Sequence, residues 1–252
     1  MSSPRRNYDL IIRRLAALPP KAWRVRRVGT VWGYPWFTVE RVVSRRAPTV
    51  LVTAGIHGEE PGSVEGALRW LERRAWAKWR VNWLVLPCIN PYGWERNQRR
   101  NAQGRDLNRQ FRGSSDCPEV ALVKRLVLRR RFLFLLDFHE DVDASGYYVY
   151  ELRAEPPFIS ERIVRAVGKV IPINRDTVID GQQTTGLALI RRTADVGALN
   201  RRPRWPMAYH LFLNSTAHVL GSETPVHFPL EQRAAAHNVA LCTALTALVR
   251  RR

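Results

Sequence analysis

The stretch TVLVTAGIHGEEPG, residues 49–62, runs from an apolar segment through a polar turn to a proline. Residues 49–54 form a short run rich in β-branched side chains, which is typical of a strand buried on both faces of a parallel sheet. Pro61 suits the first turn of a helix, because the first N–H there has no partner within the helix. The stretch therefore predicts a strand, a turn and then a helix over residues 62–79.

Alternation of strands and helices continues along the chain. Further strands are predicted over residues 23–31, 36–43, 81–89, 132–138, 147–151 and 218–222. Helices are predicted over residues 118–130, 157–170 and 230–251, a long polar loop over residues 90–115, and turns at 180–181 and 202–203 within an otherwise patternless stretch, 174–205. This order predicts an α/β fold, with a mixed, largely parallel β-sheet and helices on both faces.

The first 45 residues are expected to add an N-terminal helix and edge strands to a single domain that spans residues 1–252. Apolar side chains at helical spacing support an amphipathic helix near the start: Leu10, Ile11, Leu15 and Leu18. A secretory signal is disfavoured, because Arg13 and Arg14 interrupt the apolar stretch. No run approaches the roughly 18 apolar residues of a transmembrane helix, so the sequence predicts no membrane partner and a cytoplasmic location.

Composition is ordinary for a globular protein apart from its charge. Hydrophobic residues make up 45% of the 252 residues and charged residues 25%. The formal net charge is +19. This charge fits either an anionic partner or a genome-wide bias toward arginine that places these residues on the solvated surface. Because the arginines are scattered, direct binding of nucleic acid is the weaker interpretation. The three cysteines form no C-x-x-C pair, which points to a reducing compartment.

Four residues that can bind metal or transfer protons follow predicted buried strands. His57 and Glu60 lie in the turn after residues 49–54, and His139 and Glu223 come directly after the strands expected at 132–138 and 218–222. The carboxyl ends of parallel strands meet at one edge of an α/β sheet, where ligands bind. We therefore expect these four side chains to share one site.

This set of side chains matches the needs of metal-assisted hydrolysis. Catalytic zinc commonly takes two histidines and one glutamate and leaves a position for water or substrate, as in carboxypeptidase A. His57, Glu60 and His139 are the candidate ligands of one Zn²⁺ ion. Hydrolysis also requires a base for the water proton, for which Glu223 is the candidate. A cation near the developing oxyanion is the third requirement, and Arg99 could supply it.

Four motifs, in family order, resemble the zinc metallocarboxypeptidase family, that is, the carboxypeptidase A-like peptidases and their bacterial murein-peptide amidase relatives. They are AGIHGEEPG (54–62), INPYGWERNQRRNAQGRDLNRQF (89–111), LLDFHED (135–141) and GSETP (221–225). The resemblance implies the same zinc ligands, the same base and Arg99 at the oxyanion. It further implies that Asn108 and Arg109 hold a substrate carboxylate and that Asp106 orients His57. The family's mobile tyrosine has no assigned counterpart, since the nearest, Tyr209, lies closer to Glu223 than the family spacing.

The preferred hypothesis is therefore a zinc-dependent metallocarboxypeptidase, in which zinc and Glu223 activate water to hydrolyse the terminal amide bond of a peptide with a free carboxylate. The alternative is a zinc-dependent deacylase of N-acyl amino acids, similar to aspartoacylase and succinylglutamate desuccinylase. A non-enzymatic protein that binds polyanions is a third hypothesis. Three acidic residues beside His139, namely Glu140, Asp141 and Asp143, are interpreted as partners of loop backbone in preference to a substrate amine.

Overall fold

The computed structural model describes residues 6–193 and 196–249, so the expectations for residues 1–5, 194–195 and 250–252 lie outside the described residues. The strands are β1 (Arg24–Val31), β2 (Tyr34–Arg41), β3 (Thr49–Thr53), β4 (Asn82–Leu86), β5 (Phe134–Asp141), β6 (Tyr148–Arg153), β7 (Val178–Ile179), β8 (Gln182–Gln183), β9 (Leu189–Thr193) and β10 (His218–Pro225). The α-helices are α1 (Tyr8–Ala16), α2 (Pro61–Glu72), α3 (Pro91–Arg96), α4 (Pro118–Val127), α5 (Ser160–Val167), α6 (Val196–Arg201), α7 (Met207–Asn214) and α8 (Leu230–Leu248). Two 3₁₀ turns, η1 (Arg74–Lys78) and η2 (Leu107–Arg109), complete the described elements.

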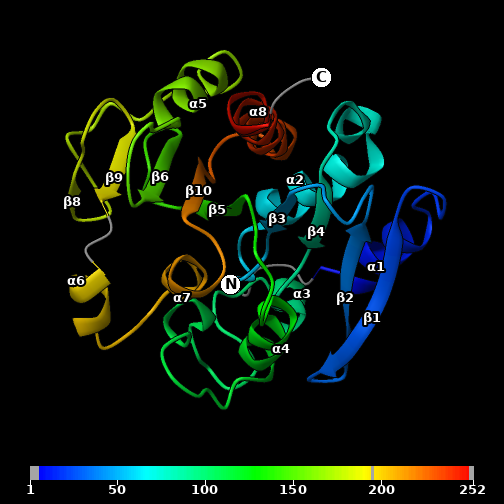
Figure 1. Ribbon diagram of the computed structural model, residues 1–252. Coiled ribbons are helices and arrows are strands. Elements are labelled where there is room, and N and C mark those ends of the chain that lie inside the picture. The colour runs from blue at the N-terminus through cyan, green and yellow to red at the C-terminus, as the bar shows by residue number, and fades with distance from the viewer. Residues whose placement is uncertain (1–5, 194–195, 250–252) are drawn as a thin grey trace.

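Among the described residues, one mixed sheet has the strand order β1-β2-β4-β3-β5-β10-β6-β9 (Figure 1). The central strands run parallel, since β3 pairs in parallel with β4 and β5, and β10 with β5. Antiparallel pairs join β1 to β2, β2 to β4 and β10 to β6. The predicted α/β fold with a mixed, largely parallel sheet is confirmed.

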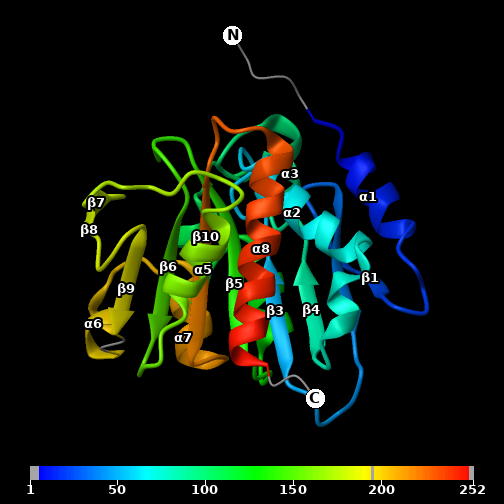
Figure 2. The same cartoon turned by 90° about the horizontal axis from the view of Figure 1, so that it is seen from above.

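Helices cover both faces of this sheet, and the side chains of β3 show why. Val50 and Val52 belong to an apolar cluster shared with α1, α2, α5 and α8, whereas Leu51 belongs to a second cluster with α4 and α7. Figure 2 shows α8 and α2 side by side along one face of the sheet. Successive residues of a strand point to opposite faces, so an unbroken apolar strand is the sequence of one buried on both sides. No helix within the described ranges is long and apolar enough to cross a membrane.

The helix predicted over residues 62–79 is shorter in the structure, so that the predicted length is wrong. The α-helix α2 ends at Glu72, and Arg73 is extended, with φ −81° and ψ 136°, before the 3₁₀ turn η1. This break turns the chain so that Trp76 is buried against Trp23, with ring centroids 5.0 Å apart. Tertiary packing of a large aromatic side chain here overrides the local helical pattern.

The structureless loop expected over residues 90–115 is also wrong, because α3 and η2 lie within it. The Asn90 side chain accepts a hydrogen bond from the Gly93 N–H at 2.9 Å, and Pro91 occupies the first turn of α3. Asparagine followed by proline is a helix-start signal. In the same way, the Asp106 side chain accepts from the Asn108 N–H at 2.9 Å and caps η2.

Two strand ends also differ from expectation. Pairing between β5 and β10 continues to Asp141 and Pro225, so that His139 and Glu223 lie inside these strands instead of just past them. In the patternless stretch, the predicted turn at residues 180–181 joins β7 to β8, while β9 and α6 were not predicted. The first helix buries Ile11 and Leu15 as expected, but Leu10 is exposed.

Candidate active site

The turn after β3 carries His57 and Glu60, and its shape depends on a close contact with α3. A Cβ atom at Gly58 would lie 2.0 Å from the carbonyl carbon of Gly93, so only glycine fits there. The Ser63 hydroxyl donates to the Glu60 carbonyl at 2.7 Å and accepts from the Gly55 N–H at 3.2 Å. These contacts fix the turn at the point where α2 begins.

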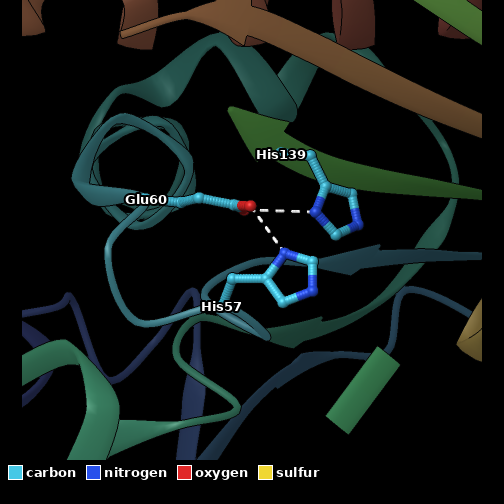
Figure 3. Close-up of side chains that lie close together, drawn as sticks. All are labelled: His57, Glu60 and His139. Carbon is cyan, nitrogen blue, oxygen red and sulfur yellow. Dashed lines mark hydrogen bonds and ion pairs between the residues drawn. The ribbon is translucent and has the colours of Figure 1, made fainter. Parts of the chain in front are cut away.

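Three of the predicted site residues converge in a buried cluster, His57, Glu60 and His139, which we call the His-Glu-His cluster. Their exposed fractions are only 3%, 2% and 6%. The Glu60 carboxylate lies 2.6 Å from Nδ1 of His57 and 3.1 Å from Nδ1 of His139 (Figure 3). One ligand atom from each residue can be chosen so that all three lie within 4.8 Å of one another.

Each imidazole of the cluster also contacts a carboxylate through its other nitrogen. Nε2 of His57 lies 3.3 Å from Asp106, and Nε2 of His139 lies 2.9 Å from Asp137. Asp106 was among the predicted site residues, but Asp137 was missed. Its position two residues before His139 on β5 places both side chains on the same face of the strand, and this spacing could have identified it.

The close contacts within the cluster shift the pKa values of all three residues. Burial would raise the pKa of Glu60, but His57 and His139 outweigh it and lower that pKa to about 2. Burial would lower the pKa of His57, yet the Glu60 and Asp106 carboxylates hold it above its ordinary value. The pKa of His139 is raised well above its ordinary value for the same reason, with Asp137 and Glu60 opposing burial. Carboxylates thus surround both rings.

This donor set fits a metal ion. Both rings direct Nδ1 toward the Glu60 carboxylate, and their Nε2 atoms are already held by other carboxylates. An imidazole that binds a metal through one nitrogen usually donates the other N–H to such an acceptor, which fixes the ring. Two imidazoles and one carboxylate form a ligand set that zinc accepts.

Glu223 lies next to this cluster on the neighbouring strand. It pairs with His139 in the parallel register of β10 and β5, and it lines a cavity of about 470 Å³ that also reaches His57, Glu60 and His139. Burial raises the pKa of Glu223 to about 8, with the nearby His139 ring offsetting part of this rise. A carboxyl group whose pKa is raised in a cavity can transfer protons near neutral pH.

The other predicted site residues, two arginines and an asparagine, also line this cavity. Arg99 lies 3.1 Å from Asp106 and 3.4 Å from Glu59. Asn108 and Arg109 line the same cavity, and the Asn108 side-chain oxygen accepts from the Met207 N–H at 2.9 Å. All eight predicted site residues therefore lie in or directly beside one cavity.

Several cavity residues were not predicted. Tyr209 on α7, to which no role was assigned, lines the cavity and accepts a hydrogen bond from Arg192 of β9. Arg202 lies over the Tyr209 ring, 5.6 Å from its centroid. Arg192 and Arg202 come from the patternless stretch, 174–205, in which only two turns were predicted, and Tyr209 follows just after it.

Other polar residues near the site have structural partners. Glu140 accepts from the Gly62 N–H at 2.6 Å, in the first turn of α2, and from the Arg233 side chain, so its partners are structural but are not the loop backbone that was expected. His237 contacts Ser222 at 2.9 Å and Thr224 at 3.3 Å within the core. These contacts give Glu140 and His237 structural roles.

Comparisons with known proteins place the chain in a family. The model of the succinylglutamate desuccinylase/aspartoacylase catalytic domain matches residues 46–174, which are 129 of the 252 residues. No curated protein matches the sequence.

Solved structures resemble almost the whole chain. A candidate metallopeptidase from Shewanella amazonensis SB2B is 25% identical with a TM-score of 0.79, over 96% of this chain and 92% of that one. Another from Shewanella baltica OS155 is also 25% identical, with a TM-score of 0.79 over 96% and 91%. Carboxypeptidase A from Helicoverpa armigera is 15% identical with a TM-score of 0.70 over 97% and 73%, which shows a shared fold. The chain therefore belongs to the succinylglutamate desuccinylase/aspartoacylase catalytic domain family and is a hydrolytic enzyme of the metallopeptidase or deacylase type.

Proposed function

We propose that the chain is a zinc-dependent metallocarboxypeptidase, a single catalytic domain that hydrolyses the terminal amide bond of a peptide with a free carboxylate. The observation that carries this proposal is the convergence of His57, Glu60 and His139 in a buried cluster beside a cavity lined by Glu223 and Arg109. When bound by this cluster, zinc would polarise the scissile carbonyl, lower the pKa of water and favour the ionised form of Glu223.

The proposed roles of the chain's own side chains follow from their positions. Glu223 takes the proton of the attacking water at its carboxylate and returns it to the nitrogen of the leaving amine. Arg99 stabilises the negative charge that develops on the carbonyl oxygen. Asn108 and Arg109 hold the substrate carboxylate, since a guanidinium fork matches a carboxylate in two hydrogen bonds.

Two carboxylates are proposed to position the ligands. Asp106 accepts from Nε2 of His57 and Asp137 from Nε2 of His139, which leaves each Nδ1 free of a proton for the metal. Asp106 also lies 3.1 Å from Arg99, so the same carboxylate contacts the proposed metal ligand His57 and the arginine proposed to stabilise the oxyanion.

A deacylase of N-acyl amino acids is the second candidate, and the family match over residues 46–174 favours it. The charges of the cavity favour a peptide. Its lining includes Asp143 and Asp180 as well as arginines, and we assign Asp143 to the substrate amine here although the sequence favoured a loop-backbone role. Asp141 also lines the cavity but accepts from the backbone N–H of Asp143 at 2.9 Å. A peptide carries an amino group that aspartates can bind, whereas an N-acyl amino acid lacks one.

A substrate comparison with zinc-loaded protein tests the proposal. The panel contains dipeptides and tripeptides with free amino and carboxyl ends, the same peptides as carboxyl-terminal amides, and N-acetyl and N-succinyl amino acids. We expect release of the last residue from the free peptides, at least about tenfold faster than from the amides, because the amides cannot form the charge-assisted pair with Arg109. Preferential hydrolysis of the N-acyl amino acids would instead establish the deacylase, and a zinc-loaded protein inactive on the whole panel would refute both.

A further inference from the structure

A second cavity, of about 480 Å³, adjoins the first and is lined mainly by polar residues. Five arginines line it, and we call it the arginine cavity: Arg100, Arg105, Arg109, Arg112 and Arg204. Two of these, Arg109 and Arg204, also line the cavity beside the His-Glu-His cluster. The other three line the arginine cavity but not the first cavity, so the proposed reaction does not account for them.

Within the described residues, no ion pair joins these guanidinium groups to an acidic side chain, although Arg109 lies near enough to Asp106 to help lower the pKa of that carboxyl. Arg100 donates to the Gly104 carbonyl at 2.8 Å and Arg112 to the Asn200 carbonyl at 3.3 Å. Asp106 is the acidic side chain of the lining, and it is already engaged by Arg99 and His57.

Some arginines elsewhere on the surface are paired with acidic side chains. Arg14 pairs with Glu65 and Glu72, and Arg130 lies 3.0 Å from Glu40. With 41 lysines and arginines against 22 acidic residues, many arginines of this chain have no acidic partner, and five arginines lie together around this one hollow. Repulsion among like charges is unfavourable unless a counter-charge is bound.

Hydrogen bonds from the buried Asn101 side chain hold the turn that carries Arg100 and Arg105. Asn101 is 1% exposed, and its side-chain oxygen accepts from the N–H groups of Gln103 and Arg105, each at 3.0 Å. Its amide group donates to Glu119 at 3.2 Å. A guanidinium anchored on a fixed turn loses less freedom when it binds a ligand, which favours a site over a diffuse charged surface.

We propose that the arginine cavity is a separate binding site for a compact, multivalent oxyanion of the phosphate or sulfate type. Guanidinium groups present planar pairs of N–H donors that match the oxygens of such groups. The volume exceeds that of one tetrahedral anion, so the natural ligand would be a small molecule that carries such a group.

The test uses the full chain and inorganic sulfate, with chloride added to hold the ionic strength constant. Sulfate is titrated into ¹⁵N-labelled protein, and the dissociation constant is taken from the amide shifts of residues 100–112. The test variant is R105A/R112A, in which neither residue belongs to the proposed catalytic or substrate-binding groups. The matched control is R45A/R46A, two exposed arginines before β3, at the opposite end of the parallel strands.

We expect saturable binding by the wild type, a loss of about tenfold or more in R105A/R112A, and a change of less than about twofold in R45A/R46A. Absence of saturable binding, or an equal loss in both double variants, would overturn the proposal. If the alanine variant does not fold, R105Q/R112Q removes the same two charges and must show the same loss. None of these measurements depends on turnover, so the result is independent of the proposed reaction.

Discussion

Replacing Glu223 by glutamine should stabilise the metal-free protein while removing most of the activity of the zinc-loaded enzyme. In the metal-free protein, burial raises the pKa of Glu223 from 4.5 to about 8. A group whose pKa is higher in the folded state binds more protons there than in the unfolded state. The free energy of unfolding therefore falls as the pH rises from about 4.5 to about 8, and the loss is complete above that range.

The size of this effect follows from the pKa values. Each unit of difference between the folded-state and unfolded-state pKa of Glu223 is worth about 1.4 kcal/mol in the free energy of unfolding. The full loss above pH 8 would therefore be about 5 kcal/mol, and the loss at pH 5 less than about 1 kcal/mol. Because Glu223 lines an open cavity, solvent screening reduces the penalty, and we expect roughly 2 kcal/mol. Glutamine has the same shape and no charge, so the variant avoids this cost.

The assay is urea unfolding of the wild type and Glu223→Gln in the presence of EDTA, at pH 5 and pH 8.5. The variant should be more stable by roughly 2 kcal/mol at pH 8.5 and nearly equal at pH 5. Glu231→Gln, an exposed glutamate at the start of α8, controls for the loss of one charge and should show no such gain. A gain of equal size at both pH values, or a loss at pH 8.5, would refute the reasoning.

Turnover by the zinc-loaded variant should fall by about 10²–10⁴ if Glu223 is the base.

Three further changes test other parts of the site. His139→Ala should abolish stoichiometric zinc binding in metal analysis, whereas the surface variant His227→Ala should retain it, and a zinc-bound His139→Ala protein would show that the ligand set is misassigned. Arg6→Ala should cost about 1–3 kcal/mol in urea unfolding, because the Arg6 guanidinium donates to the Gly58 carbonyl at 2.7 Å; unchanged stability would contradict this. Arg109→Ala should raise KM about tenfold or more with little change in kcat, and an effect confined to kcat would argue against a role in carboxylate binding.

How far the sequence predicts this molecule depends on whether the information is local. The strand, turn and helix around residues 49–72 follow from an apolar run and a well-placed proline, and His57 and Glu60 follow with them. The parallel arrangement then brings His139 and Glu223 to the same edge, because carboxyl ends of parallel strands coincide. These features need no knowledge of side-chain packing.

One miss could have been avoided from a local pattern, and the others could not. Asp137 was grouped with the apolar run of its strand, although the alternation of side chains places it on the same face as His139. Residues 174–193 and 196–205 form only short elements, of two residues in β7 and β8, five in β9 and six in α6, which are too short for a period of two or a helical period to mark them. The Arg192 contact with Tyr209 joins β9 to α7 and exists only once both have packed.

The position of Glu223 depends on side chains that face away from the cavity. Along β10, successive residues point to opposite faces of the sheet, so Ser222 and Thr224 face α8 while Glu223 faces the cavity. Ser222 lies 2.9 Å from Nδ1 of His237, and Thr224 lies 3.3 Å from its Nε2. Burial lowers the pKa of His237 to about 3, so the ring remains neutral and can accept one hydrogen bond and donate the other. A shift of β10 by one residue would break both contacts and place a hydroxyl where the carboxylate belongs. The buried histidine on α8 thus fixes the register that brings Glu223 beside His139.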